Sequence, residues 1–154
     1  MRQLIEAPQI DPRQPDYDPI AAHDLSGEIL LHDLFQREPR IDPWASQREA
    51  DILNLVQPDL DPDARPEVEC HAAICRIRLH SRDRLGDYPV VCMAKRTTLM
   101  WSAEVLEVPG PDPYKDFFLV FDREVRDRDV FLARRGASCA EFREEWRRSE
   151  QAPP

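Results

Sequence analysis

The sequence predicts an α+β fold: two N-terminal helices, an antiparallel β-sheet with a two-cysteine hairpin, and a C-terminal helix packed on the sheet. Three observations predict it. Apolar residues recur at helical spacing before position 57, runs rich in β-branched and aromatic residues follow position 66, and a capping-box sequence opens the last helical stretch. The 154 residues suit a single domain, placed at residues 25–150, which buries roughly two thirds of the surface of the unfolded chain. Disulfides are therefore optional for stability.

Residues 1–24 are predicted to form an acidic, extended arm ahead of the domain, and residues 151–154 a short tail. The arm holds four of the fifteen prolines, which fix φ and remove a backbone donor, and it lacks apolar periodicity. We expect it to bind a partner protein through Pro8, Pro12, Pro15, Tyr17 and Pro19. In that case its deletion abolishes partner binding and leaves folding intact. The alternative is a disordered tail or linker.

Two helices are predicted between residues 26 and 57. Apolar residues at 29, 30, 31, 34 and 35 give SGEILLHDLFQRE a helical spacing, which stops before Pro39. Asp42-Pro43 then offers an N-cap side chain and a proline with helical φ, so WASQREADILNLV, residues 44–56, is expected to form the second helix. Its core-facing residues are expected to be Ala45, Ile52, Leu53 and Val56.

Beyond the proline-rich linker at 57–67, strands are expected at residues 88–94, 99–108, 115–121 and 129–135. FFLVF is apolar on both parities, so its strand is expected to be central. Residues 88–100 also fit a helix, which stays open as the alternative. The charged REVRDRD, residues 123–129, is interpreted as a solvated hairpin tip. Ser138, with Glu141 three residues later, predicts a final helix over 138–149.

The stretch VECHAAICRIRL predicts a hairpin with strands 66–70 and 75–80 around a four-residue turn, HAAI. In a single straight strand one apolar set would face water, because alternate side chains share a face. The hairpin instead pairs Cys70 with Cys75, Val68 with Ile77, Glu69 with Arg76, and Glu67 with Arg78. Each carboxylate then meets a guanidinium, a cross-strand pairing of roughly 0.2–1 kcal/mol.

The same register brings the first two cysteines within disulfide range, because opposed strand residues lie about 4.5–5.5 Å apart at Cα. We expect a Cys70–Cys75 bridge, with two reduced, apolar side chains on one core face as the alternative. Cys92 and Cys139 are interpreted as separate buried, apolar residues, with a second disulfide as the alternative. A zinc site is disfavoured, since C-x4-C is wider than the usual ligand pair and no second pair occurs. No metal or other cofactor is expected.

The run from LFQREPRIDPWASQREADILNLV to VECHAAICRIRL resembles a domain that recurs in uncharacterised exported or membrane-tethered proteins of myxobacteria and relatives. There a tryptophan-bearing helix precedes a V-x-C-x4-C-R-[VI] hairpin. The resemblance covers residues 34–80, with FLARRG a weaker echo; the long proline-rich arm and the missing leader depart from it. It implies no activity. It favours a trimmed or soluble portion outside the cytoplasm, with a cytoplasmic location as the alternative.

Charge and motifs narrow the function. The net charge is -9, and residues 1–69 alone carry 16 acidic and 6 basic side chains, so a phosphate backbone would repel the chain and nucleic-acid binding is disfavoured. No window has the 18 consecutive apolar residues of a membrane span. Phosphate-loop, nucleophile-elbow and HExxH patterns are missing. We therefore expect a non-catalytic protein-binding or assembly module, an accessory subunit of a larger envelope complex. The alternative is a small redox protein with Cys70 and Cys75 as its dithiol. The oligomeric state stays open.

Overall fold

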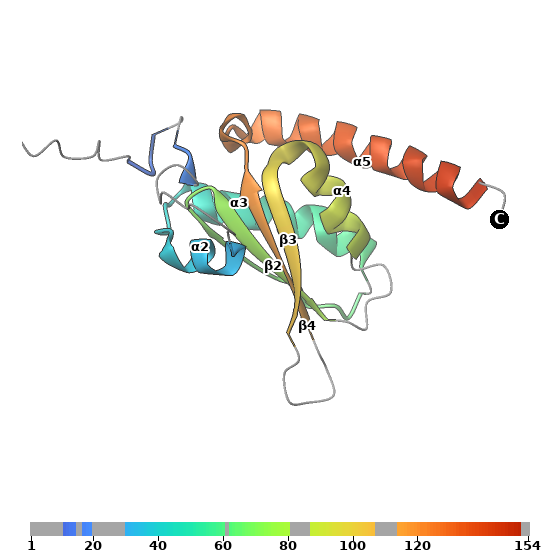
Figure 1. Cartoon of the computed structure of the whole chain (residues 1–154), viewed down its shortest axis with the longest axis horizontal. Helices are drawn as coiled ribbons and strands as arrows, with labels where there is room; N and C mark the ends of the chain where they lie inside the picture. The colour runs from blue at the N-terminus through green and yellow to red at the C-terminus, as the bar shows by residue number, and fades with distance from the viewer. Residues whose placement is uncertain are drawn as a thin grey trace, which may run out of the picture.

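The computed structural model describes residues 11–14, 17–19, 30–60, 62–80, 87–106 and 114–151. Its helices are α2 (Leu31–Arg37), α3 (Trp44–Val56), α4 (Asp87–Thr97) and α5 (Arg128–Gln151), with short 3-10 turns η1 (Gln57–Asp59) and η2 (Arg123–Arg126). Its strands are β1 (Glu67–His71), β2 (Ile74–His80), β3 (Thr98–Leu106) and β4 (Tyr114–Phe121). They form one antiparallel sheet in the order β1-β2-β4-β3 (Figure 1). The α+β prediction is confirmed, and the FFLVF strand, β4, is central.

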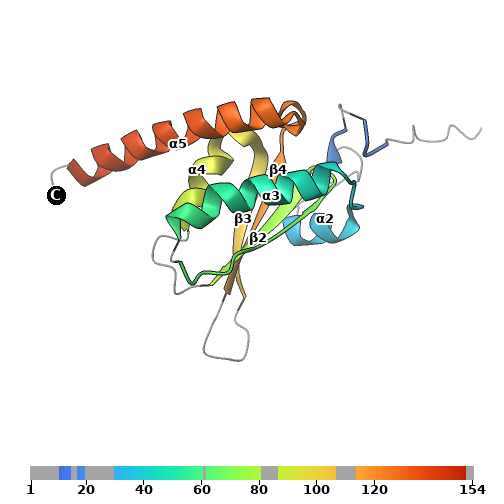
Figure 2. The same ribbon diagram turned by 180° about the vertical axis from the view of Figure 1, so that it is seen from behind.

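Helices cover both faces of the sheet. α3, α4 and the start of α5 lie on one face and α2 on the other, as the two opposite views show (Figures 1 and 2). The larger core buries the side chains that the strands point toward α3 and α4, among them Cys70, Cys75, Ile77, Phe117, Leu119 and Phe121. The smaller core joins Leu31, Leu34 and Phe35 of α2 to Ile74, Phe118 and Val120. FFLVF is apolar on both parities because each parity meets a helix.

The cysteine hairpin has the predicted register and a shorter turn than predicted. The observed pairs are Glu67–Arg78, Val68–Ile77, Glu69–Arg76 and Cys70–Cys75. The four-residue turn is wrong: pairing continues through His71, so Ala72 and Ala73 alone make the turn. Ala73 has φ 61°, in the left-handed region that alanine seldom adopts. Tertiary bonds hold it there: Ala72 N–H donates to Pro39 O at 2.7 Å, and Ala73 O accepts from Phe121 N–H at 2.8 Å.

The second predicted helix, α3, begins where expected. Asp42 Oδ1 accepts the Ser46 N–H at 3.1 Å, which satisfies one of the free donors of the first turn. The predicted core residues Ala45, Ile52 and Val56 are buried. Leu53 is only half-buried, whereas Arg48 and Asp51 are buried. The helix therefore turns part of its charged face inward, toward η2 and α5.

The strand predicted at residues 88–94 is wrong, and its helical alternative is correct. Val90, Met93 and Ala94 stand at i, i+3 and i+4 in α4 and are fully buried. This spacing lets one helix face cover the sheet, and that packing outweighs the strand preference of the valines.

The strand predicted at 129–135 and the hairpin tip at 123–129 are also wrong. Residues 123–126 form η2, and α5 starts at Arg128, well before Ser138. Asp127 caps α5, because its Oδ1 accepts the Val130 N–H at 3.1 Å. Ser138 lies inside α5, where its hydroxyl donates to the Cys92 carbonyl at 2.5 Å. Near its own N-terminus α5 packs on the sheet through Phe131, and the rest of the helix then lies along α4.

All four cysteines form disulfides. The predicted Cys70–Cys75 bridge is confirmed, with Cα atoms 4.1 Å apart. Treating Cys92 and Cys139 as separate apolar residues is wrong: they form a bridge with Cα atoms 4.5 Å apart. This second bridge ties α4 to the middle of α5. Since the expected strand over 88–94 is a helix beside α5, the two sulfurs meet on facing helices.

The described part of the predicted arm is residues 11–14 and 17–19, so Pro8 and Pro15 lie outside it. Tyr17 is only 3% exposed and packs with Ala72 and Ala73 of the hairpin turn, beside Ile41. Its hydroxyl donates to the Glu38 carboxylate, with the two oxygens at 2.6 and 2.7 Å. Burial, and then the Glu38 carboxylate, raise the pKa of Tyr17. Tyr17 is thus used inside this fold instead of being open to a partner. Pro12 is half-buried and Pro19 buried.

Replacing Tyr17 by phenylalanine is expected to lower the free energy of unfolding by about 1.5–3 kcal/mol, because the buried Glu38 carboxylate loses a hydrogen-bond donor. Urea unfolding measures it. The matched control is Tyr88→Phe: the Tyr88 hydroxyl accepts a solvent-exposed bond from Arg143, so its loss should change stability little. Equal losses in the two variants would show that the Tyr17–Glu38 bond does not hold the arm.

Candidate functional site: the outer edge of β3

The sheet has two edge strands, β1 and β3, and the β1 edge is covered by the chain itself. Cys70 N–H donates to Glu49 Oε2 at 2.8 Å, and Cys70 O accepts from Arg40 Nη1 at 3.3 Å. Arg40 in turn pairs with Glu49 at 2.6 Å. An added strand therefore meets side chains already bonded to this edge, which is one way that proteins block edge-to-edge pairing.

The Glu49 contact predicts that replacing Glu49 changes stability by an amount that depends on pH. The Arg40 guanidinium, helped by the Cys70 N–H, holds the pKa of Glu49 below its ordinary value. The stability that the Glu49 carboxylate contributes is therefore complete above its pKa in the unfolded chain, about 4.3. It is lost as the pH falls through the lower pKa of Glu49 in the folded chain. We expect Glu49→Gln to lower the free energy of unfolding by about 1.5 kcal/mol at pH 7. The gap to the native chain should close below pH 4 in urea titrations. A gap that stays constant down to pH 3 would contradict this.

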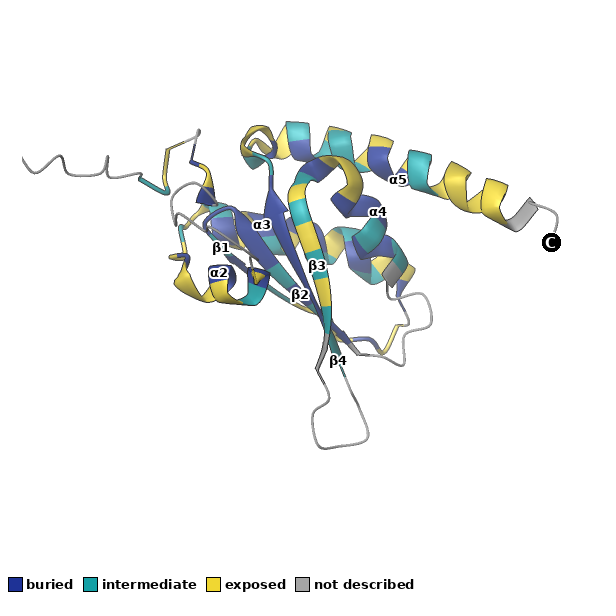
Figure 3. Cartoon of the chain, in the orientation of Figure 1, coloured by how far each residue is buried: buried dark blue, intermediate teal, exposed yellow. Residues whose placement is uncertain are grey.

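The β3 edge carries no such cover in the part of the chain that the structure describes: no hydrogen bond joins another element to its outer side. Nine residues long, β3 has one charged side chain, Glu104, and no proline. Leu99 is 49% exposed and Trp101 42% exposed. Figure 3 shows exposed positions along β3, next to the buried β4. The register of β3 against β4 shifts between Thr98 and Met100, so the regular part of this apolar edge begins at Met100, and an edge of that kind is a place where another strand can pair.

The exposed side chains of β3 adjoin the larger core. Trp101 pairs with Leu119 and Ala103 with Phe117, two residues of that core, so Trp101 and Ala103 lie on the face that α3 and α4 cover. Both are nonetheless exposed, since the helices leave this margin of the sheet bare. A strand added beside β3 would continue the sheet and cover the Trp101 ring at once.

The outer face of the hairpin holds the predicted ion pairs. The distance from the Arg76 guanidinium nitrogen to the Glu69 carboxylate oxygen is 3.7 Å, and the corresponding distance from Arg78 to Glu67 is 4.0 Å. The stronger partner of Arg78, which the sequence analysis missed, is Asp116 of β4, held through two bonds of 2.7 and 3.0 Å. Asp116 is 1% exposed. Its signal in the sequence is a carboxylate just before the apolar FFLVF run.

Asp116→Asn is expected to lower the free energy of unfolding by about 2 kcal/mol, because the Arg78 guanidinium loses its buried, bidentate partner. Glu67 pairs with the same arginine, but that ion pair is longer and solvent-exposed. Glu67→Gln should therefore leave the free energy of unfolding unchanged within error. Thermal or urea unfolding of the two variants checks the order. The reverse order would assign the hairpin's electrostatic support to the cross-strand pairs.

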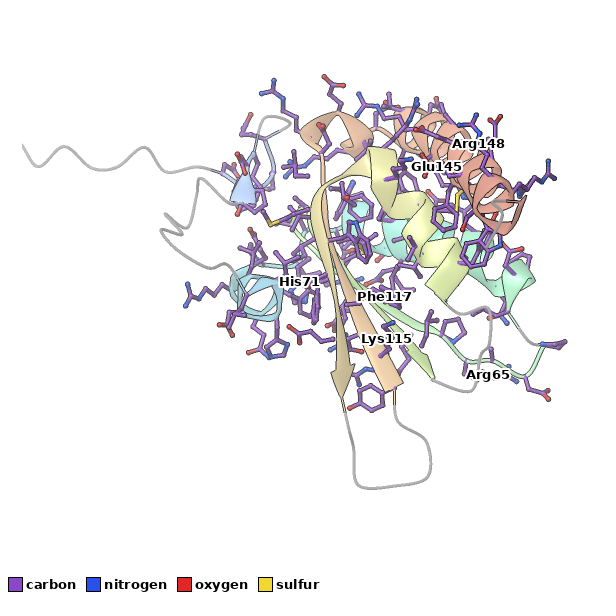
Figure 4. All side chains as sticks on the ribbon, turned by 45° about the vertical axis from the view of Figure 1, so that its right-hand side comes forward. Arg65, His71, Lys115, Phe117, Glu145 and Arg148 are labelled. Carbon is purple, nitrogen blue, oxygen red and sulfur yellow. A yellow bond between two sulfur atoms is a disulfide. The ribbon has the colours of Figure 1, made fainter. Side chains whose placement is uncertain are left out.

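His71 and the first disulfide point to opposite faces. The His71 ring stacks on Phe35 with centroids 4.0 Å apart, and Nδ1–H donates to the Phe35 carbonyl at 2.6 Å, beside α2 (Figure 4). The sulfurs of Cys70 and Cys75 are buried in the larger core. His71 therefore cannot serve as a base for either cysteine in this conformation.

The described residues provide neither a metal site nor a membrane-spanning helix. No group of three or more histidine, cysteine or acidic side chains is placed there to hold a metal ion. No described helix combines the length and apolar character needed to cross a bilayer. The arrangement that remains is a bare strand edge. Comparisons of the chain with known protein families, with curated proteins and with solved structures found no match.

Proposed function

We propose that this chain is a non-catalytic protein-binding or assembly module, an accessory subunit of a larger complex, which binds an extended polypeptide segment along the outer edge of β3. The observation that carries the proposal is the contrast between the two edges: Arg40 and Glu49 occupy β1, whereas β3 stands bare beside Leu99 and Trp101. Strand addition draws affinity from main-chain bonds and specificity from alternate side chains. Trp101 is the proposed anchor, because it lies on the β3 edge and tryptophan is enriched among the residues that carry binding energy at interfaces.

The disulfides support a place outside the cytoplasm, since such bonds persist in oxidising compartments. They also weigh against the dithiol alternative. A redox-active pair needs an accessible thiol, whereas Cys70 and Cys75 are both fully buried. The proposed role for the first disulfide is to fix the hairpin on which α3 packs.

Site-specific photo-crosslinking in the native host tests the proposal. A benzophenone amino acid replaces Leu99 on β3 or, as the matched control, Leu30, a leucine ahead of α2 that is somewhat more exposed than Leu99. We expect a discrete adduct from position 99, identified by mass spectrometry, and none from position 30. Absence of an adduct at 99, or the same adducts from both positions, would overturn the function.

A further inference from the structure

We propose that the segment bound at β3 is the β3 strand of a second copy of this chain, so that two four-stranded sheets join into one eight-stranded sheet. This inference rests on the proposed function and names its partner. The pairing is antiparallel, about a two-fold axis perpendicular to the sheet. Such an axis keeps each face continuous, so that the helices of both copies cover the same side.

The length of β3 favours a register near the middle of the strand. With the axis at Ser102, the middle of Thr98–Leu106, residues 100–104 of the regular part of each strand pair with one another, and pairing continues outward as far as the irregularity at Leu99, where the β3–β4 register shifts. Antiparallel strands make on average about one main-chain hydrogen bond per residue pair, so a central register forms more bonds than one near the end of the strand. Moving the axis to Glu104 would leave only residues 102–106 paired.

The charge pattern favours the same register. With the axis at Ser102, the one charged side chain of the strand, Glu104, lies opposite Met100 of the second copy. With the axis at Glu104, two carboxylates would lie directly opposite each other, which is destabilising. The central register also sets Trp101 opposite the small Ala103, which leaves room for the indole ring on the helix-covered face.

An unsatisfied polar atom marks the axis itself. Ser102 Oγ is buried, yet it has no hydrogen-bond partner among the residues that the structure places. Buried hydroxyl groups normally have one. In the proposed pair the two Ser102 residues lie directly opposite each other, and rotation about one side-chain bond brings the hydroxyls together. Each hydroxyl both donates and accepts, so the contact is self-complementary.

Cysteine cross-linking tests the register. Opposed residues lie about 4.5–5.5 Å apart at Cα, within disulfide range, so Ser102→Cys should form a covalent dimer under mild oxidation. Met100→Cys and Glu104→Cys alone should not, because each lies four residues, about 13 Å, from its own copy. Mixed together, those two variants should cross-link to each other. Peptide mapping confirms that the two native disulfides stay intact.

Sedimentation equilibrium tests the dimer without cross-linking. The native chain should be a dimer, and Ser102→Lys or Ser102→Glu alone should weaken it at least about tenfold, because like charges meet at the axis. An equimolar mixture of the two variants should recover a heterodimer. Circular dichroism confirms folding. A monomeric native chain at all concentrations, or free cross-linking of Met100→Cys to itself, overturns the inference. If position 99 still cross-links to a different protein, the proposed function stands without it.

Discussion

Replacing both Cys92 and Cys139 by alanine is expected to lower the free energy of unfolding by about 4 kcal/mol. The bridge joins residues 47 apart in sequence, so it removes a large amount of conformational freedom from the unfolded chain. It also holds α5 against α4, next to the buried Ser138–Cys92 bond. Urea unfolding of the double variant, with a check that Cys70 and Cys75 remain bridged, measures the loss.

The matched control is the double alanine variant of Cys70 and Cys75, whose loop is far shorter at a separation of 5. The same chain-entropy relation gives about 2 kcal/mol for it. The hairpin also keeps its register through the pairs on either side of the bridge. A larger loss from the short loop than from the long one would refute this account of the two disulfides.

Arg48→Ala is expected to cost about 3–5 kcal/mol, comparable with truncation of a large core side chain. Arg48 is 2% exposed, with its guanidinium carbon 3.8 Å from the Phe131 ring centroid and 5.1 and 5.3 Å from those of Phe121 and Trp44. Its Nη2 also donates to the Val125 carbonyl. One side chain thus joins α3 to β4, η2 and α5, and alanine would leave a void among the rings.

Arg48→Met separates the packing of Arg48 from its charge. Burial lowers the pKa of Arg48 to about 10, so the group stays charged at neutral pH at a desolvation cost. Methionine fills similar space without that cost but leaves the Val125 carbonyl unpaired, so we expect a loss well below that of alanine. Differential scanning calorimetry or urea unfolding compares them. Equal losses in both variants would place the stabilisation in the charge and its hydrogen bond instead.

The hairpin could be predicted because its evidence is local and redundant. Apolar, sulfur and charge pairs all mirror one turn, so a single register satisfies every one of them. The shorter turn could not be read from HAAI. Ala73 has its positive φ in a turn that is held by two bonds to residues distant in sequence, from Ala72 to Pro39 and from Phe121 to Ala73.

The errors lie where tertiary packing overrides local preference. Val90 and Val91 favour a strand by local preference. In the structure Val90, Met93 and Ala94 form one helix face instead, and its packing against the sheet stabilises the helix. A strand over residues 88–94 gives Cys92 and Cys139 no shared surface, so the sequence offers their bridge only as an alternative. The bare β3 edge could not be predicted from the sequence either, because the order of strands in the sheet decides which strands are outermost.

Tyr17 has a mechanical consequence. Its ring contacts the hairpin turn at Ala72 and Ala73, is bonded to Glu38, and lies 5.3 Å from the Arg126 guanidinium. A pull on the chain from its N-terminal side would therefore be shared among three segments distant in sequence, none of which is β3. Tension applied at that end would therefore be carried by contacts that lie away from the β3 edge.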